Sequence, residues 1–173
     1  DDEVTYKRNT SSFDNCDLVP NVLNGVEDVD ISTTIMGQKI EMPIYCSPTA
    51  LQRLFHHKGE EAVAAAAEEF GTMFGVSSLG TVSLEKLRNY KTPQFYQFYF
   101  HKDRELNRAM LQSANEAGIE VMMLTVDTIT GGNRERDLRT GFSIPLRLNF
   151  AGMLQFALKP QWGMNYLIHE KFK

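Results

Sequence analysis

The stretch "IEVMMLTVDTITGGNRERD" (residues 119–137) changes from apolar to polar within a few residues. Its first part, residues 119–126, has the length and the β-branched content of a buried strand. Thr125 lies near the end of this part, and a glycine pair and Arg134 follow it. In parallel α/β folds, functional groups gather where the strands end. The stretch therefore predicts a buried strand that leads into a functional loop.

Three similar apolar runs precede this one: "MPIYCS" (42–47), "TMFGVS" (72–77) and "QFYQFYF" (94–100). Stretches with helical signals separate them, at residues 58–71, 83–90 and 103–118. The signals are cap residues and stop residues, with Ser83 and Asp103 as expected N-caps and Gly71 and Gly118 just past the expected helix ends. Apolar strands that alternate with helices predict an α/β fold with a parallel sheet.

Two α/β architectures fit this alternation, a doubly wound sheet and a (β/α)8 TIM barrel. The sequence has neither a GxGxxG motif after its first strand nor a P-loop, so the nucleotide-binding doubly wound fold lacks its usual support. A complete barrel needs about 250 residues. We therefore expect the N-terminal half of a TIM barrel. Residues 30–42 alternate around Met36-Gly37 and predict a β-hairpin before the first strand, placed as a plug beneath the sheet.

Composition limits the classes of function. The chain has 173 residues, 42% of them hydrophobic, and a formal net charge of −4. This mild acidity argues against a nucleic-acid partner, because no basic stripe is available to neutralise phosphates. Two cysteines, Cys16 and Cys46, are too few for a disulfide framework and are interpreted as reduced thiols. No group of residues has metal-ligand spacing, and no apolar run is long enough to span a membrane.

Each expected strand ends in hydrogen-bonding groups. "SPTA" (47–50) follows the first strand and "SSLG" (77–80) follows the second. The third carries Gln97 and Tyr99, and the fourth carries Thr125 and is followed by Arg134. We expect these groups to line one rim and to bind a flat ligand that is uncharged or anionic, with Arg134 as the cation.

The motifs "PTA", "SSLG", "QFYF" and "LTVDTITGGNRERDLRTGF" occur in order over residues 1–142 and resemble the family of FMN-dependent 2-hydroxyacid dehydrogenases and oxidases. The resemblance implies FMN as cofactor and oxidation of an L-2-hydroxy acid of the lactate or mandelate type. It implies FMN-binding roles for Pro48, Thr49, Ala50, Ser77, Gln97 and Thr125. It implies that Tyr99 and Arg134 bind the substrate and act in catalysis, while Gly131 and Gly132 let the loop turn back over the flavin.

The resemblance also says what these residues lack. The family's catalytic histidine, a lysine beside the flavin and a second substrate arginine belong to the other half of the barrel, which we expect as a partner of this chain. Of the four histidines, His56, His57, His101 and His169, none is assigned as the base, and all are interpreted as surface groups.

Residues 143–173 are more apolar than a barrel loop usually is. We expect them to form an insert after the fourth strand, distinct from the barrel half at residues 1–142. The insert resembles that of membrane-associated mandelate dehydrogenase, and "LNFAGMLQFAL" (148–158) is interpreted as an interfacial segment. An oligomer contact and a lid over the barrel remain alternatives.

The insert favours a dehydrogenase that passes electrons to a quinone or a cytochrome, over an oxidase that uses oxygen. The two reduced cysteines favour a cytoplasmic protein, and the insert adds a peripheral position on the inner membrane as an expectation. We also expect a homo-tetramer. The remaining alternatives are an FMN isomerase or another phosphate-binding barrel, and a non-catalytic scaffold that binds flavin without turnover.

Overall fold

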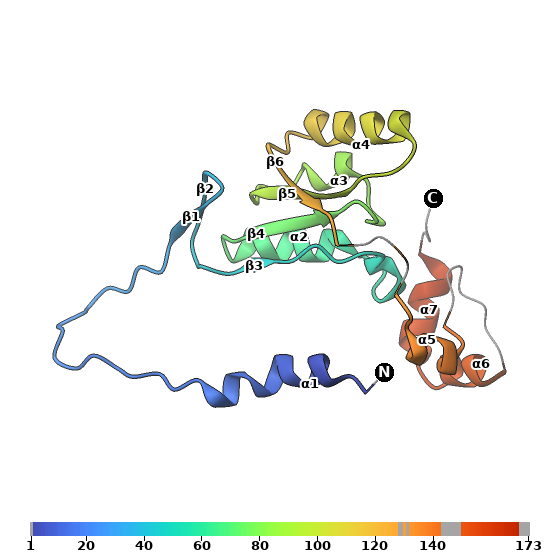
Figure 1. Ribbon diagram of the computed structural model, residues 1–173, viewed down its shortest axis with the longest axis horizontal. Coiled ribbons are helices and arrows are strands. Elements are labelled where there is room, and N and C mark those ends of the chain that lie inside the picture. The colour runs from blue at the N-terminus through green and yellow to red at the C-terminus, as the bar shows by residue number, and fades with distance from the viewer. Residues whose placement is uncertain (1, 128–129, 131, 143–149, 170–173) are drawn as a thin grey trace.

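The computed structural model describes residues 2–127, 130, 132–142 and 150–169. Its centre is a four-stranded parallel sheet whose strands lie in chain order (Figure 1). The strands are β3 (Tyr45–Cys46), β4 (Met73–Ser77), β5 (Gln94–Tyr99) and β6 (Val121–Thr125). Strands that follow one another in space as in sequence, joined by helices, are the arrangement of one half of a TIM barrel. The described residues contain no closed barrel, in agreement with the expected half.

Three helices follow β3, β4 and β5 in turn and pack on one face of the sheet (Figure 1). They are α2 (Glu60–Glu69), α3 (Leu84–Leu87) and α4 (Arg104–Glu116). The end signals in the sequence are confirmed for α4, because Asp103 Oδ1 accepts hydrogen bonds from the backbone of Glu105 and Leu106. Gly118 follows at φ +80°, where a residue without Cβ is favoured. Ser83 does occupy the N-cap of α3, but its side chain makes no capping hydrogen bond.

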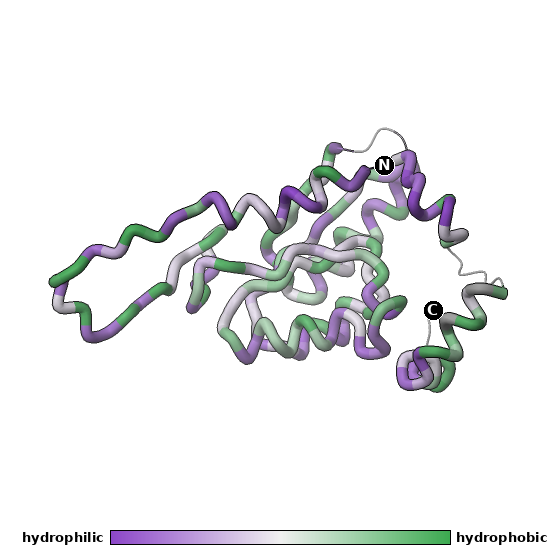
Figure 2. The backbone as a smooth tube through the Cα atoms, turned by 90° about the horizontal axis from the view of Figure 1, so that it is seen from below, coloured by the Kyte–Doolittle hydropathy of each residue, from purple (hydrophilic) through white to green (hydrophobic). Residues whose placement is uncertain are grey.

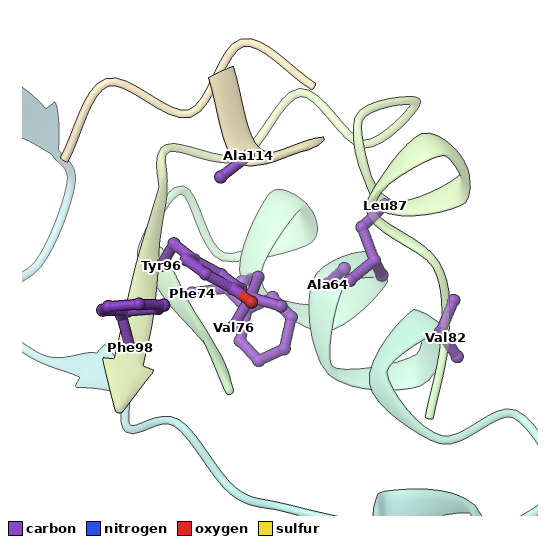
Figure 3. Packing of buried hydrophobic residues seen from close by; sticks show 9 residues of the cluster. Ala64, Phe74, Val76, Val82, Leu87, Tyr96, Phe98 and Ala114 are labelled. Carbon is purple, nitrogen blue, oxygen red and sulfur yellow. The ribbon is translucent and has the colours of Figure 1, made fainter. Parts of the chain in front are cut away.

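The main core lies between the sheet and these helices (Figure 3). Alternate residues of the strands enter it, with Phe74 and Val76 from β4 and Tyr96 and Phe98 from β5. The helices contribute small or branched side chains, Ala64, Ala67, Leu87 and Ala114. Because side chains alternate along a strand, the intervening residues of β4 and β5 point to the opposite face.

That opposite face is sealed at its amino end by a hairpin of β1 (Thr33–Ile35) and β2 (Gln38–Ile40). The turn residues Met36 and Gly37 have φ values of 51° and 77°, as a type I′ turn requires. Ile40 packs fully buried against Met73 and Phe95 in a second, smaller core. The hairpin predicted from the sequence is therefore confirmed, together with its place as a plug.

Two segments lie outside this layered unit (Figures 1 and 2). At the start of the chain, α1 (Val4–Ser11) and the 3-10 helix η1 (Phe13–Asn15) lead into an extended arm, residues 16–32. Beyond the carboxyl ends of the strands lie α5 (Glu135–Thr140), α6 (Phe150–Ala157) and α7 (Pro160–Ile168). An ion pair joins the two segments, with Arg136 of α5 donating to Glu3 at 2.6 Å.

Candidate functional site

Three of the residues predicted to bind a cofactor form one hydrogen-bonded row across the carboxyl ends of β4, β5 and β6. Ser77 Oγ donates to Gln97 Oε1 at 3.3 Å, and Gln97 Nε2 donates to Thr125 Oγ1 at 2.7 Å. The backbone N–H of Leu79 donates to Ser77 Oγ at 3.1 Å, which extends the row into the next loop. We call Ser77, Gln97 and Thr125 the polar row. It lies on the face of the sheet opposite the helices.

The polar row is more buried than polar side chains that simply face solvent. Ser77 and Gln97 are each only 6% exposed, and Thr125 is half-buried. A buried side-chain amide is costly unless it is hydrogen-bonded, so the bonds along the row hold Gln97 in one orientation. Its strand neighbours Tyr96 and Phe98 belong instead to the main apolar core on the other face of the sheet.

Tyr99 lies next to the polar row at the end of β5. It pairs with Thr125 in the parallel ladder of β5 and β6. It also lies two residues after Gln97, so both side chains leave the same face of the strand. Tyr99 is half-buried, whereas Tyr96 on the other face lies in the core, where burial raises the pKa of its phenol. The two tyrosines of β5 therefore have different environments, and Tyr99 is the one beside the polar row.

The loop after β3 approaches the same face. Pro48 and Ala50 are half-buried and Thr49 is exposed, with its hydroxyl 3.4 Å from the carbonyl oxygen of Ser47. The approach depends on Gly75 in β4, because a Cβ there would lie 2.8 Å from Pro48 Cδ and 2.4 Å from Phe95 Cζ. The glycine thus allows the loop to pack onto the strand.

Arg134 lies at the N-cap of α5, just beyond β6, and is exposed. No hydrogen bond or ion pair joins its guanidinium to Tyr99 or to the polar row within the described part of the chain. The structure brings Ser77, Gln97 and Thr125 into direct contact, with Tyr99 next to them in the ladder, but not Arg134. Gly131, predicted to shape this loop, lies outside the described residues, and Gly132 is exposed in open space.

The interpretation of the four histidines as surface groups holds for His56 and His169, which are exposed, and in part for the other two. His101 is half-buried, and so is His57, whose Nδ1 is buried. The His57 ring stacks on His169 just after α7, with 4.3 Å between ring centroids, and lies 4.3 Å from the ring of His56. Desolvation, followed by the charges of His169, His56 and Lys58, lowers the pKa of His57 from 6.5. This contact joins the insert to the barrel half.

A second contact supports the same junction, because Trp162 Nε1 of α7 donates to the carbonyl oxygen of Phe55 at 2.9 Å. Neither contact could be found in the sequence, since each joins residues more than a hundred positions apart with no shared motif. A cavity of about 470 Å³ lies beside this junction, between His56 and the start of α7. Another, of about 400 Å³, lies at the amino ends of β5 and β6. Neither is lined by the polar row.

Over the described ranges, no three His, Cys, Asp or Glu side chains are grouped so that they could hold a metal ion. None of the helices with described residues combines the length and the apolar content needed to cross a membrane.

The chain matches the model of the FMN-dependent dehydrogenase family over residues 1–173. It belongs to this family. Among relatives, it is 38% identical over 157 residues to an L-lactate oxidase of Nostoc sp., a match that covers 88% of this chain and 43% of the relative. Glycolate oxidase 1 of Zea mays is also 38% identical, with 88% and 42% covered. The chain thus spans less than half the length of these relatives.

The fold is also similar to those of solved structures. A monotopic membrane protein, (S)-mandelate dehydrogenase, superposes with a TM-score of 0.90 at 29% identity, over 100% of this chain and 46% of the other. A lactate oxidase of Pediococcus acidilactici gives a TM-score of 0.77 at 31% identity, over 92% and 44%. The predicted family, the FMN cofactor of that family and the predicted half-barrel are therefore confirmed.

The chemistry of the polar row fits a flavin. The pyrimidine edge of an isoalloxazine ring presents two carbonyl acceptors with an N–H donor between them. Gln97 carries both a carbonyl and an amide N–H, and the hydroxyls of Ser77 and Thr125 can donate or accept. The bonds within the row use one amide hydrogen of Gln97 and the hydroxyl hydrogen of Ser77. The second amide hydrogen of Gln97 and the hydroxyl hydrogen of Thr125 are then available to a ligand.

Proposed function

We propose that this chain forms the first half of the active site of an enzyme that oxidises an L-2-hydroxy acid, of the lactate or mandelate type, to the 2-oxo acid with FMN. The polar row is the observation that carries the proposal, since it offers matched donors and acceptors on the open face of the sheet. Membership of the FMN-dependent dehydrogenase family supports it. So do its relatives, an L-lactate oxidase and a glycolate oxidase, because lactate and glycolate are both 2-hydroxy acids.

In this proposal the cofactor contacts come from two regions of the rim. Ser77, Gln97 and Thr125 bond the pyrimidine edge of the ring system. The peptide groups of Pro48, Thr49 and Ala50 lie along the ring. Bound FMN supplies the acceptor for the two electrons that leave the substrate. The part of this chain is to fix the plane of the ring through groups that are already held by their neighbours.

The substrate contacts come from Tyr99 and Arg134. The phenol of Tyr99 donates a hydrogen bond to the hydroxyl or carboxylate of the acid. The guanidinium of Arg134 grips the carboxylate through two parallel N–H bonds, a geometry that lysine does not offer. Gripping requires the loop before α5 to bring Arg134 over Tyr99. The base that takes a proton from the substrate, either from its hydroxyl or from its α-carbon, belongs to the second half of the barrel, which the proposal includes as a partner.

Replacing Gln97 by leucine in the complete enzyme tests the cofactor contact. Gln97→Leu removes the two bonds of the row and leaves Ser77 and Thr125 without their shared partner, so we expect the Kd for FMN to rise at least about tenfold, equivalent to about 1.4 kcal/mol. Gln112→Leu is the matched control, because Gln112 is exposed on α4 and bonds only the neighbouring Glu116. Unchanged FMN binding in the Gln97 variant contradicts the assignment.

Anaerobic mixing with L-lactate and L-mandelate tests the reaction. We expect one of these acids to bleach the flavin absorbance of the complete enzyme. A flavin band that persists with both supports the non-catalytic scaffold, and a colourless protein excludes both. In Arg134→Met we expect kcat/KM to fall by about a hundredfold, from the loss of a charged hydrogen-bond pair, with Arg134→Lys recovering only part of it.

A finer proposal concerns the electron acceptor. We infer a dehydrogenase that reduces a membrane quinone or a cytochrome, with the segment 143–173 lying on the membrane surface as a peripheral anchor and the enzyme assembling as a homo-tetramer on the cytoplasmic face. The support is a set of apolar side chains on α6, α7 and the link between them, each more than half exposed: Phe150, Met153, Leu154, Leu158, Met164, Leu167 and Ile168. Residues 143–149 and 170–173 of this segment lie outside the described residues.

Flotation with vesicles of phosphatidylcholine and phosphatidylglycerol tests the membrane surface. Changing Phe150 and Leu154 together to serine removes two exposed apolar side chains, and we expect vesicle binding to fall at least about tenfold. The control pair is Phe70 and Leu111, exposed apolar residues of the barrel half. Binding that survives deletion of 148–158 rejects membrane docking.

The rate at which the reduced flavin is reoxidised tests the electron acceptor. Rapid reoxidation by oxygen, with none by a soluble quinone, supports an oxidase instead.

A further inference from the structure

Glu60 is a fully buried acidic residue that the proposed chemistry does not use. It is the first residue of α2 and has 0% exposure. A carboxyl group is rarely buried unless specific partners satisfy it. Its position at the amino end of a helix favours a negative charge but does not require burial. The partners of Glu60 therefore indicate its role.

Both oxygens of Glu60 accept hydrogen bonds from one residue, Thr81. Oε1 accepts from the Thr81 backbone N–H at 2.8 Å, and Oε2 accepts from the Thr81 hydroxyl at 2.7 Å. The hydroxyl oxygen in turn accepts from the backbone N–H of Arg53 at 3.1 Å. We call these three groups the Glu60 tie. It runs from Arg53, through Thr81, to the start of α2.

Two members of the Glu60 tie, Arg53 and Thr81, belong to the two loops that adjoin the proposed cofactor contacts. Arg53 lies in the 3-10 helix η2 (Gln52–Leu54), directly after Pro48, Thr49 and Ala50. Thr81 follows Ser77 by four residues, at the end of the loop after β4. A further bond joins the same loops, from the N–H of Leu51 to the carbonyl oxygen of Leu79 at 3.0 Å. The tie therefore holds one loop against the other.

Close backbone approach confirms that the Glu60 tie is tightly packed. A Cβ at Gly59 would lie 2.6 Å from Arg53 Cγ and 3.3 Å from Thr81 Oγ1. A Cβ at Gly80 would lie 3.0 Å from the carbonyl oxygen of Ser77 and 3.6 Å from Glu60 Oε1. Both glycines thus let the loops close around the carboxyl group.

We propose that Glu60 is a positioning residue for FMN, acting through Thr81 and Arg53 to set the spacing between the two rim loops. The proposal rests on the proposed function, because it concerns the same cofactor. Glu60 touches neither cofactor nor substrate. Its effect passes through the loop that begins after Ser77 and the loop that holds Pro48, Thr49 and Ala50, so its loss widens the spacing between these loops without removing any direct contact.

The test measures the Kd for FMN and the shape of the bound flavin's visible absorbance band in the complete enzyme. We expect Glu60→Ala to raise the Kd at least about tenfold and to move the band towards that of free FMN. Glu60→Gln keeps the volume and one acceptor, so the increase in Kd is smaller. Thr81→Val removes the hydroxyl from the other side of the tie and changes Kd and band in the same direction, which keeps the test valid if Glu60→Ala does not fold.

Leu87→Ala is the control for simple destabilisation, because Leu87 is fully buried in α3 and makes no side-chain bond in the tie. Glu61→Gln is the control for charge, since Glu61 pairs instead with the Arg53 guanidinium at 3.5 Å. If Leu87→Ala lowers Tm as much and weakens FMN equally, Glu60 is merely structural and the proposal is overturned. A parent enzyme that binds no FMN overturns the proposed function itself.

Discussion

The barrel half and the insert use the same kinds of side chain in opposite ways. Phe95 in β5 has 0% exposure, whereas Phe150 in α6 is 85% exposed. The strands bury apolar residues against a helical layer on one face and a hairpin on the other, whereas in the insert the aromatic group of Phe156, Trp162 and Tyr166 is only half-buried. Apolar content alone therefore does not identify a core. The side chains of the barrel half stabilise the fold, and most of those on α6 and α7 are available to a partner.

Replacing Phe95 by alanine gives the largest expected change. The residue fills the small core between the hairpin and the sheet, so we expect a loss of about 3–5 kcal/mol in the free energy of unfolding. Phe150→Ala, at an exposed site, should change it by less than about 0.5 kcal/mol. Urea unfolding of both variants measures the difference. Equal losses in the two variants would show that Phe150 also packs in a core, and would contradict the contrast between the barrel half and the insert.

Two glycines give a second, smaller contrast. Gly75→Ala places a Cβ 2.4 Å from Phe95 Cζ and 2.8 Å from Pro48 Cδ, and overpacking of this kind costs about 1–3 kcal/mol. Gly132→Ala in the loop before α5 meets nothing within 4 Å, so its effect should stay below about 0.5 kcal/mol. Thermal unfolding measures both, and the Kd for FMN should also rise in Gly75→Ala because Pro48 is displaced. A neutral Gly75→Ala would refute the close approach of this loop.

The helix ends give a third contrast. Asp103→Ala removes two capping bonds from α4 and should cost about 1 kcal/mol. Ser83→Ala should cost clearly less, because the Ser83 side chain makes no capping bond. Helix α7 likewise begins without one, at Lys159. Chemical denaturation of the two alanine variants separates a working cap from a residue that merely occupies the position.

These contrasts also show what the sequence could predict. The cap at Asp103, the Met36-Gly37 turn and the end of α4 at Gly118 depend on residues a few positions apart, and local pattern was sufficient. The gathering of Ser77, Gln97 and Thr125 followed from a general rule, that parallel strands end at one rim. Strand ends were less accurate, since 42–47 was expected where β3 is Tyr45–Cys46.

Contacts between distant segments could not be predicted. In the sequence Glu60 lies near the start of the helix expected at residues 58–71, and nothing local indicates that it is buried against Thr81. The stacking of His57 on His169 depends on how α7 lies against the barrel half. The position of Arg134 relative to the polar row could not be predicted either, because a loop and not a strand places its side chain.

The junction between the two regions gives the smallest expected effect, a dependence on pH. The pKa of His57 is lowered from 6.5, chiefly by desolvation and then by His169, His56 and Lys58. When α7 leaves the barrel half, the His57 ring regains water and loses His169, so its pKa returns towards the ordinary value. The open state then binds more protons than the closed state between the lowered pKa and about 6.5.

Closure of α7 is therefore fully stabilised by this group above about pH 6.5 and loses that stabilisation as the pH falls through the lowered pKa. Hydrogen exchange of the α7 amides at about pH 5 and about pH 8, corrected for intrinsic rates, measures the effect. We expect less protection at the lower pH in the parent, and a smaller pH dependence in His57→Gln. His101→Gln is the control, because His101 meets Phe98 edge to face, away from the junction. If the pH dependence in His101→Gln falls as far as in His57→Gln, the contact between His57 and His169 does not hold the insert. Among the described residues, the bond from Trp162 to Phe55 then still joins α7 to the barrel half.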